Sequence, residues 1–223
     1  MSDSYCYDDS DVLINRFGIT DPMCLDITER GLSELYAKEI LNRRNITVNG
    51  WGLNTLSRIH KALFGDVYPW AGHVRTIGIG KDGLGFCDVQ DIKPALSEMK
   101  NDIESLPERK GLGEFVRDIA AIHAVLNSVH PFREGNGRTM RTFLTLYARS
   151  KGYDLDYGLY PKEMQLAADR SALSEDADSS ALAVMYASIT SPYEGRQRIT
   201  VVRGASVKEP LIGERKREAY RER

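Results

Sequence analysis

Apolar side chains recur at helical spacing through most of the first 150 residues, and this repetition limits the chain to a mainly helical fold. In residues 91–106, apolar positions three or four apart form one continuous stripe, which is typical of an amphipathic helix. Similar stripes predict helices over 31–44, 53–64 and 138–150. Residues 113–129 are apolar on most sides and predict a central buried helix. We therefore expect an all-α helical bundle.

Boundary signals add two further helices near the C-terminus. Pro161 stands where a first helical turn would begin, and Asp178 is suited to cap a segment that runs to Ile189. Gly152 is a plausible stop for the helix that precedes them. After Gly195 the composition becomes charged and mixed, with one strand-like run, "RQRITVVRG". We read this region as an extension or as the start of a further domain.

Residues 74–89 break the helical pattern, because branched side chains alternate there with small or polar ones. This alternation predicts a single β-hairpin with strands Val74–Ile79 and Phe86–Val89. Glycines at 78, 80, 83 and 85 favour an irregular tip. Because an isolated hairpin is only weakly stable, we expect this one to pack against the helices.

Composition narrows the cellular setting and the partners. A chain of 223 residues with 42% hydrophobic residues can bury the core of one domain with a small appendage. A net charge of −2 favours neither a nucleic-acid nor a membrane partner. The three cysteines are odd in number and lack metal-site spacing, and neither a signal peptide nor a membrane-spanning run is evident. We expect a cytoplasmic protein with free thiols.

The run "HPFREGNGRTMR", from His130 to Arg141, combines a base, an acid and an anion-binding backbone. Gly135, Asn136 and Gly137 precede a helix predicted to begin near Arg138. Their amides, together with the positive end of the helix, are suited to bind an anion such as phosphate. Arg138 and Arg141 are three apart, so we expect both to point toward this anion site.

Glu134 and His130 complete the chemistry that this run suggests. A carboxylate beside a phosphate site is favourable when it holds Mg²⁺, and a histidine accepts a proton near neutral pH. Phe132 is read as an apolar anchor of the loop. Taken singly, each of these residues is more often structural. Together they favour nucleophilic attack on a nucleotide phosphate, with His130 as the base.

The same run resembles the signature of the Fic family, His-Pro-Phe-x-(Asp/Glu)-Gly-Asn-Gly-Arg-x-x-Arg, at every defined position. The segment "YPWAGHVRT" and the hairpin after it look like the flap of that family. The resemblance implies a Fic-type helical bundle over 1–192, with a flap at about 74–89, an active-site loop at 130–138 and a C-terminal extension at 193–223.

The resemblance also implies an activity, namely transfer of AMP from Mg-ATP to a Ser, Thr or Tyr hydroxyl of a target protein with release of pyrophosphate. Two alternatives stay open. One is transfer of another phosphate-linked group, such as UMP or phosphocholine. The other is a nucleotide-dependent binding module without turnover, which the presence of both His130 and Glu134 disfavours, since a pure binder needs neither.

Roles follow by residue from the resemblance. His130 is the general base and Glu134 binds Mg²⁺. The nucleotide-binding residues are Arg133, Gly135, Asn136, Gly137, Arg138 and Arg141. In the flap, strand addition would dock the target protein, and the candidate docking residues are Ile79, Lys81 and Asp82. For Lys81 and Asp82 the alternative is that they only keep an exposed turn soluble.

The resemblance raises a question of inhibition as well. "TSPYEG", from Thr190 to Gly195, fits the letters of the family's inhibitory motif, with Glu194 as the inhibitory residue. Because Pro192 disfavours the helix that this motif normally forms, we expect the match to be accidental and any inhibitor to be a separate antitoxin-like protein. The N-terminal run also resembles that of effectors delivered into host cells. That likeness suggests secretion without a signal peptide and a small GTPase as target.

Overall fold

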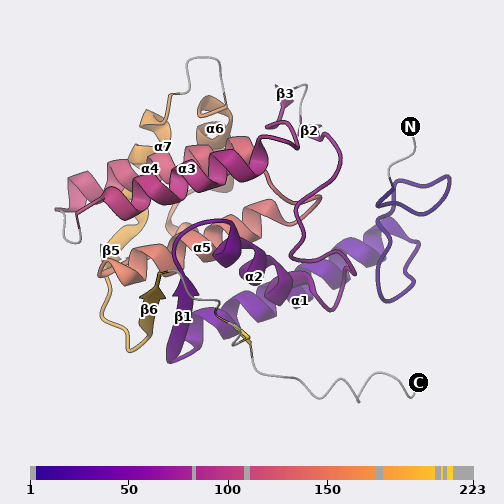
Figure 1. Ribbon diagram of the computed structural model, residues 1–223, viewed down its shortest axis with the longest axis horizontal. Helices are drawn as coiled ribbons and strands as arrows, with labels where there is room; N and C mark the ends of the chain where they lie inside the picture. Colours follow the sequence, from indigo (N-terminus) through magenta and orange to yellow (C-terminus); the bar gives the residue numbers. More distant parts are fainter. Residues whose placement is uncertain are drawn as a thin grey trace.

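Over the residues that the structure describes, the fold is a bundle of helices with three short two-stranded sheets. Figure 1 shows how the helices are arranged. The structure is a computed structural model that describes residues 4–81, 84–107, 111–173, 178–203, 207 and 210–212. Its helices are α1 (Pro22–Asn42), α2 (Leu53–Phe64), α3 (Ile92–Ser105), α4 (Leu112–Val129), α5 (Asn136–Ser150), α6 (Lys162–Ser171) and α7 (Ser180–Ile189), with a 3₁₀ turn at Tyr157–Leu159. The predicted all-α class is confirmed. Within the described ranges, no helix has both the length and the apolar character to cross a bilayer.

Helix α4 lies in the middle of the bundle and contacts α3, α5 and α7 (Figure 1). Nine of its residues are buried, including Phe115, Ile119 and Leu126, so its apolar surface is covered on several sides as predicted. Helix α5 follows α4 after a short loop and packs against α1 and α2 as well. The loop that joins these two interior helices is the segment singled out above, residues 130–135.

Helix α1 begins nine residues earlier than its apolar stripe predicts. The Asp21 side chain accepts a hydrogen bond from the Cys24 amide at 2.8 Å, and Pro22 takes the first helical position. The apolar stripe of 31–44 contains Leu35, Tyr36 and Ile40 and predicts that all three face the core. Tyr36 and Ile40 are buried, whereas Leu35 is 52% exposed. The earlier start brings the first two turns of α1 close to α5, which matters for the site described below.

The predicted hairpin is present, but its ladder is shorter than expected. Strand β2 (Gly80–Lys81) pairs with β3 (Leu84–Gly85), and one further bond joins the Phe86 amide to the Ile79 carbonyl at 3.1 Å. The flanking segments Val74–Ile79 and Phe86–Val89 are therefore not strands. Instead, their polar groups bond to the C-terminal end of α4.

Two strand pairings were not predicted, and neither of them is a hairpin. Strand β1 (Asn45–Asn49) pairs in parallel with β6 (Arg198–Val202), and β4 (Tyr153–Leu155) pairs antiparallel with β5 (Thr190–Pro192). The strand suggested by "RQRITVVRG" is confirmed as β6. It joins a segment beyond residue 192 to the helical core, while the proposed boundary at that residue stays a prediction.

Candidate active site in the loop between α4 and α5

His130 ends helix α4 in the left-handed conformation, with φ 45° and ψ 63°. Positive φ is uncommon for residues other than glycine and is often associated with functional sites. The His130 amide donates to the Leu126 carbonyl at 3.1 Å. The proline that follows His130 redirects the chain into the loop.

The imidazole of His130 has one nitrogen fixed by the same helix end. Its Nδ1 lies 3.1 Å from the Asn127 carbonyl oxygen, and since a carbonyl only accepts, Nδ1 carries the proton in the neutral ring. Nε2 is then the basic nitrogen. One face of the ring stacks on Phe86, with centroids 3.8 Å apart and planes 8° from parallel. The ring thus has a defined tautomer and a defined plane.

Helix α5 begins directly after the loop, at Asn136, two residues earlier than predicted. Gly135 is its N-cap, with φ 79°, and a Cβ there would lie 2.4 Å from ring atoms of Phe64. Only glycine therefore fits this position without displacing the ring. The first-turn amides of a helix lack partners within it, so the α5 N-terminus presents donors and partial positive charge to an anion.

Asn136 holds the loop closed through its side chain. Its Oδ1 accepts from the Phe132 amide at 2.9 Å, and its Nδ2 donates to the Phe132 carbonyl at 2.7 Å. Phe132 is fully buried, so its predicted role as an anchor is confirmed. The Asn136 side chain is occupied by these bonds, which leaves its backbone amide as the group suited to contact an anion.

His60 supports the loop from below and was not recognised from the sequence. Its ring stacks on Phe132 at 4.0 Å, its Nε2 lies 2.9 Å from the Glu134 carbonyl oxygen, and its Nδ1 accepts from the Gly72 amide at 2.8 Å. Burial lowers the pKa of His60 to about 4, so the ring is neutral at physiological pH. A single buried histidine carries no sequence signal that separates this role from an ordinary core position.

Glu134 points its carboxylate toward the start of α5. Its Oε1 accepts from the Gly135 amide at 2.8 Å and lies 3.7 Å from Nη2 of Arg138, while the side chain is 46% exposed. Among the described residues no cluster of three or more acidic, histidine or cysteine side chains forms a metal cage. One accessible carboxylate fits Mg²⁺, which commonly uses one or two carboxylates together with phosphate oxygens.

Arg138 is held by helix α1, although the sequence suggested that it faces the anion site together with Arg141. Its Nη2 donates to Glu29 Oε1, its Nη1 donates to Ser33 Oγ at 2.9 Å, and its guanidinium lies 4.9 Å from the ring centroid of Phe64. Glu29 is buried and is a partner that the sequence did not reveal, because it lies 109 positions away along the chain.

Arg141 has the opposite environment. It is exposed, and its guanidinium makes no hydrogen bond or ion pair with any described residue. A Cβ on Gly137 would lie 3.8 Å from Nη1 of Arg141, so the side chain extends beside the first turn of α5. Arg133, the remaining arginine of the loop, is half-buried. The structure thus brings Arg141 and Gly137 together at the accessible side of the helix N-terminus.

The other predicted positions fall outside this cluster. Ile79 is half-buried at the base of the hairpin, Lys81 lies in β2, and Asp82 lies outside the described residues. Glu194 is exposed and follows β5. The adjacent Tyr193 amide bonds to the Gly152 carbonyl, beyond the C-terminal end of α5, whereas Arg141 lies near its start. The structure therefore does not bring Glu194 to Arg141.

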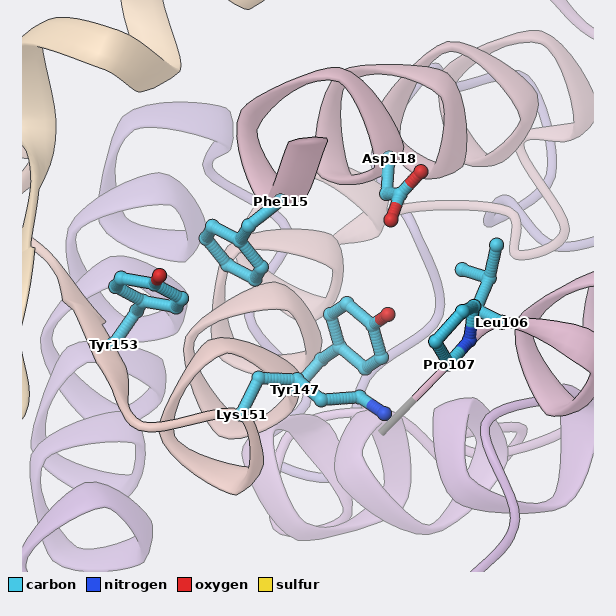
Figure 2. A pocket seen from close by; sticks show the side chains of 7 residues that line it. All are labelled: Leu106, Pro107, Phe115, Asp118, Tyr147, Lys151 and Tyr153. Atoms are coloured by element: carbon cyan, nitrogen blue, oxygen red, sulfur yellow. The ribbon is translucent and has the colours of Figure 1, made fainter. Parts of the chain in front are cut away.

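The hollow shown in Figure 2 lies elsewhere, between the end of α3, α4 and α5. Tyr147 and Asp118 are among the side chains that line it. Tyr147 is eleven residues after Asn136. At about 1.5 Å per helical residue, roughly 16 Å of helix separates the hollow from the α5 N-terminus. We assign the hollow to packing between helices, and the loop stays the candidate functional site.

The bundle, the hairpin and the loop at the start of α5 define a helical domain with a candidate anion site at that loop. The family model described as Fic/DOC matches residues 51–148, which include the whole loop. "Probable protein adenylyltransferase y4lH" of Sinorhizobium fredii is 33% identical over 175 residues, covering 77% of this chain and 88% of that protein. The chain belongs to the Fic/DOC family.

Further likenesses agree with this assignment. "Protein adenylyltransferase VbhT" of Bartonella schoenbuchensis is 35% identical over 158 residues, which cover 70% of this chain. The match spans only 33% of the length of VbhT. An N-terminal Fic domain from Bartonella quintana superposes with a TM-score of 0.73 at 26% identity, covering 84% of this chain and 92% of that one. BepC of Bartonella tribocorum, crystallised with AMPPNP, has a TM-score of 0.75 at 23% identity, covering 85% and 97%.

Proposed function

We propose that this chain is a protein adenylyltransferase that moves AMP from Mg-ATP to a Ser, Thr or Tyr hydroxyl of a target protein. The relatives named protein adenylyltransferases support the activity at the level of the family. The observation that carries the proposal is the fixed tautomer of His130. Its Nδ1 hydrogen bond to Asn127 leaves Nε2 as the proton acceptor, on the loop that leads into α5.

In this proposal His130 Nε2 takes the proton of the incoming hydroxyl, and the hydroxyl oxygen forms a bond to the α-phosphorus of ATP. The bond between that phosphorus and the bridging oxygen breaks, and pyrophosphate leaves with the electron pair. Glu134 would hold Mg²⁺, which neutralises phosphate charge when bound. The backbone of Gly135, Asn136 and Gly137 would contact phosphate oxygens.

The arginines take different parts in the same scheme. We propose that Arg141, which is exposed beside Gly137, binds the terminal phosphates, and that Arg133 contributes to nucleotide binding. Arg138 would contact phosphate from its fixed place against Glu29. Because Arg141 is exposed and forms no ion pair with a described residue, it is also the residue that a separate antitoxin-like inhibitor would engage with a carboxylate.

The target and the setting are further parts of the proposal. We propose that the β2–β3 hairpin docks the target segment by strand addition near Ile79, Lys81 and Asp82, and that the target is a small GTPase. Structural neighbours are described as VirB-translocated Bartonella effectors, which supports delivery from the bacterial cytoplasm into a host cell.

The test is incubation of the purified chain with a cell lysate, Mg²⁺ and ATP labelled on the α-phosphate. We expect a labelled protein band, no transfer from ATP labelled on the γ-phosphate, and a mass increase of the target equal to one AMP group. His130→Ala should still bind ATP and should lose the labelling. Equal labelling by wild type and His130→Ala, or a mass increase matching UMP or phosphocholine with the respective donors, would contradict the proposal.

A further inference from the structure

Arg75 is a buried cation that the proposed reaction does not use. Its side chain is 1% exposed, and in the described part of the chain no carboxylate forms an ion pair with it. A buried guanidinium is costly unless its donors are satisfied. Here they are satisfied by backbone carbonyl oxygens alone, those of Ile77 at 2.8 Å, His130 at 2.9 Å, Val129 at 3.3 Å and Cys87.

These four acceptors belong to two parts of the molecule. Val129 and His130 form the C-terminal end of α4, while Ile77 and Cys87 lie on the two segments that enter and leave the β2–β3 hairpin. Backbone bonds reinforce the same junction, because the Arg75 amide donates to the Pro131 carbonyl at 2.9 Å and the Cys87 amide to the Ser128 carbonyl at 3.0 Å. The Arg75 side chain thus joins the segments before and after the hairpin to the loop that begins at His130.

The junction also completes the end of helix α4. The last carbonyls of a helix need partners from outside it, and a cation there is favoured by the helix dipole. His130 bonds two of these carbonyl oxygens, that of Leu126 through its amide and that of Asn127 through Nδ1. The Ser128 carbonyl accepts from the Cys87 amide, and the Val129 carbonyl accepts from Arg75. His130 keeps its left-handed conformation within this set of bonds.

Phe86 provides a second link between the hairpin and His130. It directly follows β3, its amide bonds to the Ile79 carbonyl at 3.1 Å, and its ring stacks on the His130 imidazole at 3.8 Å. Arg75 therefore fixes the backbone of His130, and Phe86 fixes the plane of its ring. A displacement of the hairpin would move both contacts.

We propose that Arg75 and Phe86 are positioning residues that join the hairpin and His130 into one unit, so that a target segment docked on the hairpin brings its hydroxyl to Nε2 at a set distance. This inference rests on the proposed role of His130 as the base. A small misplacement of reacting groups can lower a rate by roughly a hundredfold, so the effect should appear in the transfer step.

The test compares Arg75→Lys and Phe86→Leu with Arg149→Lys as the matched control. Arg149 is also mostly buried, with hydrogen bonds to Asp154 and the Leu41 carbonyl, but it lies at the far end of α5. For each protein we would measure the initial rate of label transfer, the Kd for AMPPNP with Mg²⁺ by calorimetry, and the ¹⁵N shifts of the His130 imidazole by NMR.

We expect Arg75→Lys and Phe86→Leu to lower the transfer rate by about tenfold or more, to change the Kd less than twofold, and to shift the His130 imidazole signals. Arg149→Lys should lose stability without these changes. If Arg75→Lys does not fold, Phe86→Leu decides alone, since its half-buried ring is not part of the core. Unchanged imidazole signals in the folded variants would overturn the inference. Shifted signals in a chain whose wild type transfers no label would support the positioning and would reject the base role.

Discussion

The two arginines at the start of α5 lie three residues apart and have opposite surroundings. Arg138 is bound to the buried carboxylate of Glu29 and to Ser33, both on α1, whereas Arg141 is exposed and makes no hydrogen bond or ion pair with a described residue. Helical spacing alone treats them as equivalent. The difference shows that one arginine is part of the folded structure, while the other is available to a ligand or a partner.

Gly135 and Gly137 have different surroundings as well. A Cβ at Gly135 would overlap the Phe64 ring, whereas a Cβ at Gly137 would meet only Nη1 of Arg141, at 3.8 Å. We call Gly135 and Arg138 the inner pair, and Gly137 and Arg141 the outer pair. Substitutions in the inner pair should affect stability more than nucleotide binding, and substitutions in the outer pair should affect nucleotide binding more than stability.

The largest difference is expected between the two glycines. Gly135→Ala combines positive φ with overlap against a buried ring, so it should lower the free energy of unfolding by about 3 kcal/mol or more. Gly137→Ala should change it by less than about 1 kcal/mol, because its methyl group has room, while weakening nucleotide binding by crowding the anion site. Urea unfolding and calorimetry with AMPPNP separate the two. Equal losses of stability would break the comparison.

The contribution of His60, which packs under the loop, to the stability of the protein should depend on pH. The pKa of His60 is about 4 in the folded protein, below its ordinary value near 6.5, so the unfolded chain binds more protons between these two pH values. Its contribution to stability is therefore complete above about pH 6.5 and is lost as the pH falls toward 4, by about 3 kcal/mol in total.

Urea unfolding at pH 7, 6 and 5 measures this loss, and His60→Gln is the comparison protein. The variant should be less stable at pH 7 and should show a flatter dependence on pH, because the other titrating groups are common to both proteins. A pH dependence of equal slope in both would show that His60 is not the group responsible.

Arg138→Met should destabilise the protein by about 3 kcal/mol, because it leaves the buried Glu29 carboxylate with Tyr68 as its one remaining hydrogen-bond partner among the described residues. Glu29→Gln combined with Arg138→Met should recover part of this loss, since the remaining group is uncharged. Thermal unfolding of the two single variants and the double variant gives the coupling. Additive losses would mean that the contact between α1 and α5 contributes little.

The smallest effect on folding is expected for Arg141→Met, whose side chain is exposed. The free energy of unfolding should change by less than about 0.5 kcal/mol. The Kd for AMPPNP should rise about tenfold, as expected for the loss of one charge-assisted hydrogen bond to phosphate. Arg117→Met on the exposed surface of α4 is the control and should alter neither quantity. Unchanged nucleotide affinity in Arg141→Met would show that Arg141 does not take part in nucleotide binding.

Much of the fold was predictable because its signals are local. The stripe that includes Leu96 and Met99 gave α3, and Asp178, which accepts a bond from the Ser180 amide at 2.8 Å, marked the start of α7 as predicted. The early start of α1 also had a local signal, Asp21 followed by Pro22, which is independent of the apolar stripe. The pairing of β1 with β6 had none, because its two strands lie about 150 residues apart.

The candidate site shows the same difference between local and long-range signals. The residues that lie together within the loop form one continuous run, so their proximity was evident from the sequence. Their supports were not, because Glu29, His60 and Arg75 reach the loop from three separate segments and carry no motif of their own. A buried polar side chain and a surface one look alike in a sequence until the fold defines their partners.

The most direct test of the account is whether the loop binds a triphosphate. Titration of the ¹⁵N-labelled chain with AMPPNP and Mg²⁺ should shift the backbone amide signals of Gly135, Asn136 and Gly137 until they saturate, and the three signals should give one common Kd. The same titration of Gly137→Ala should give a higher Kd. Binding that leaves these three amides unmoved, or no binding at millimolar nucleotide, would contradict the account.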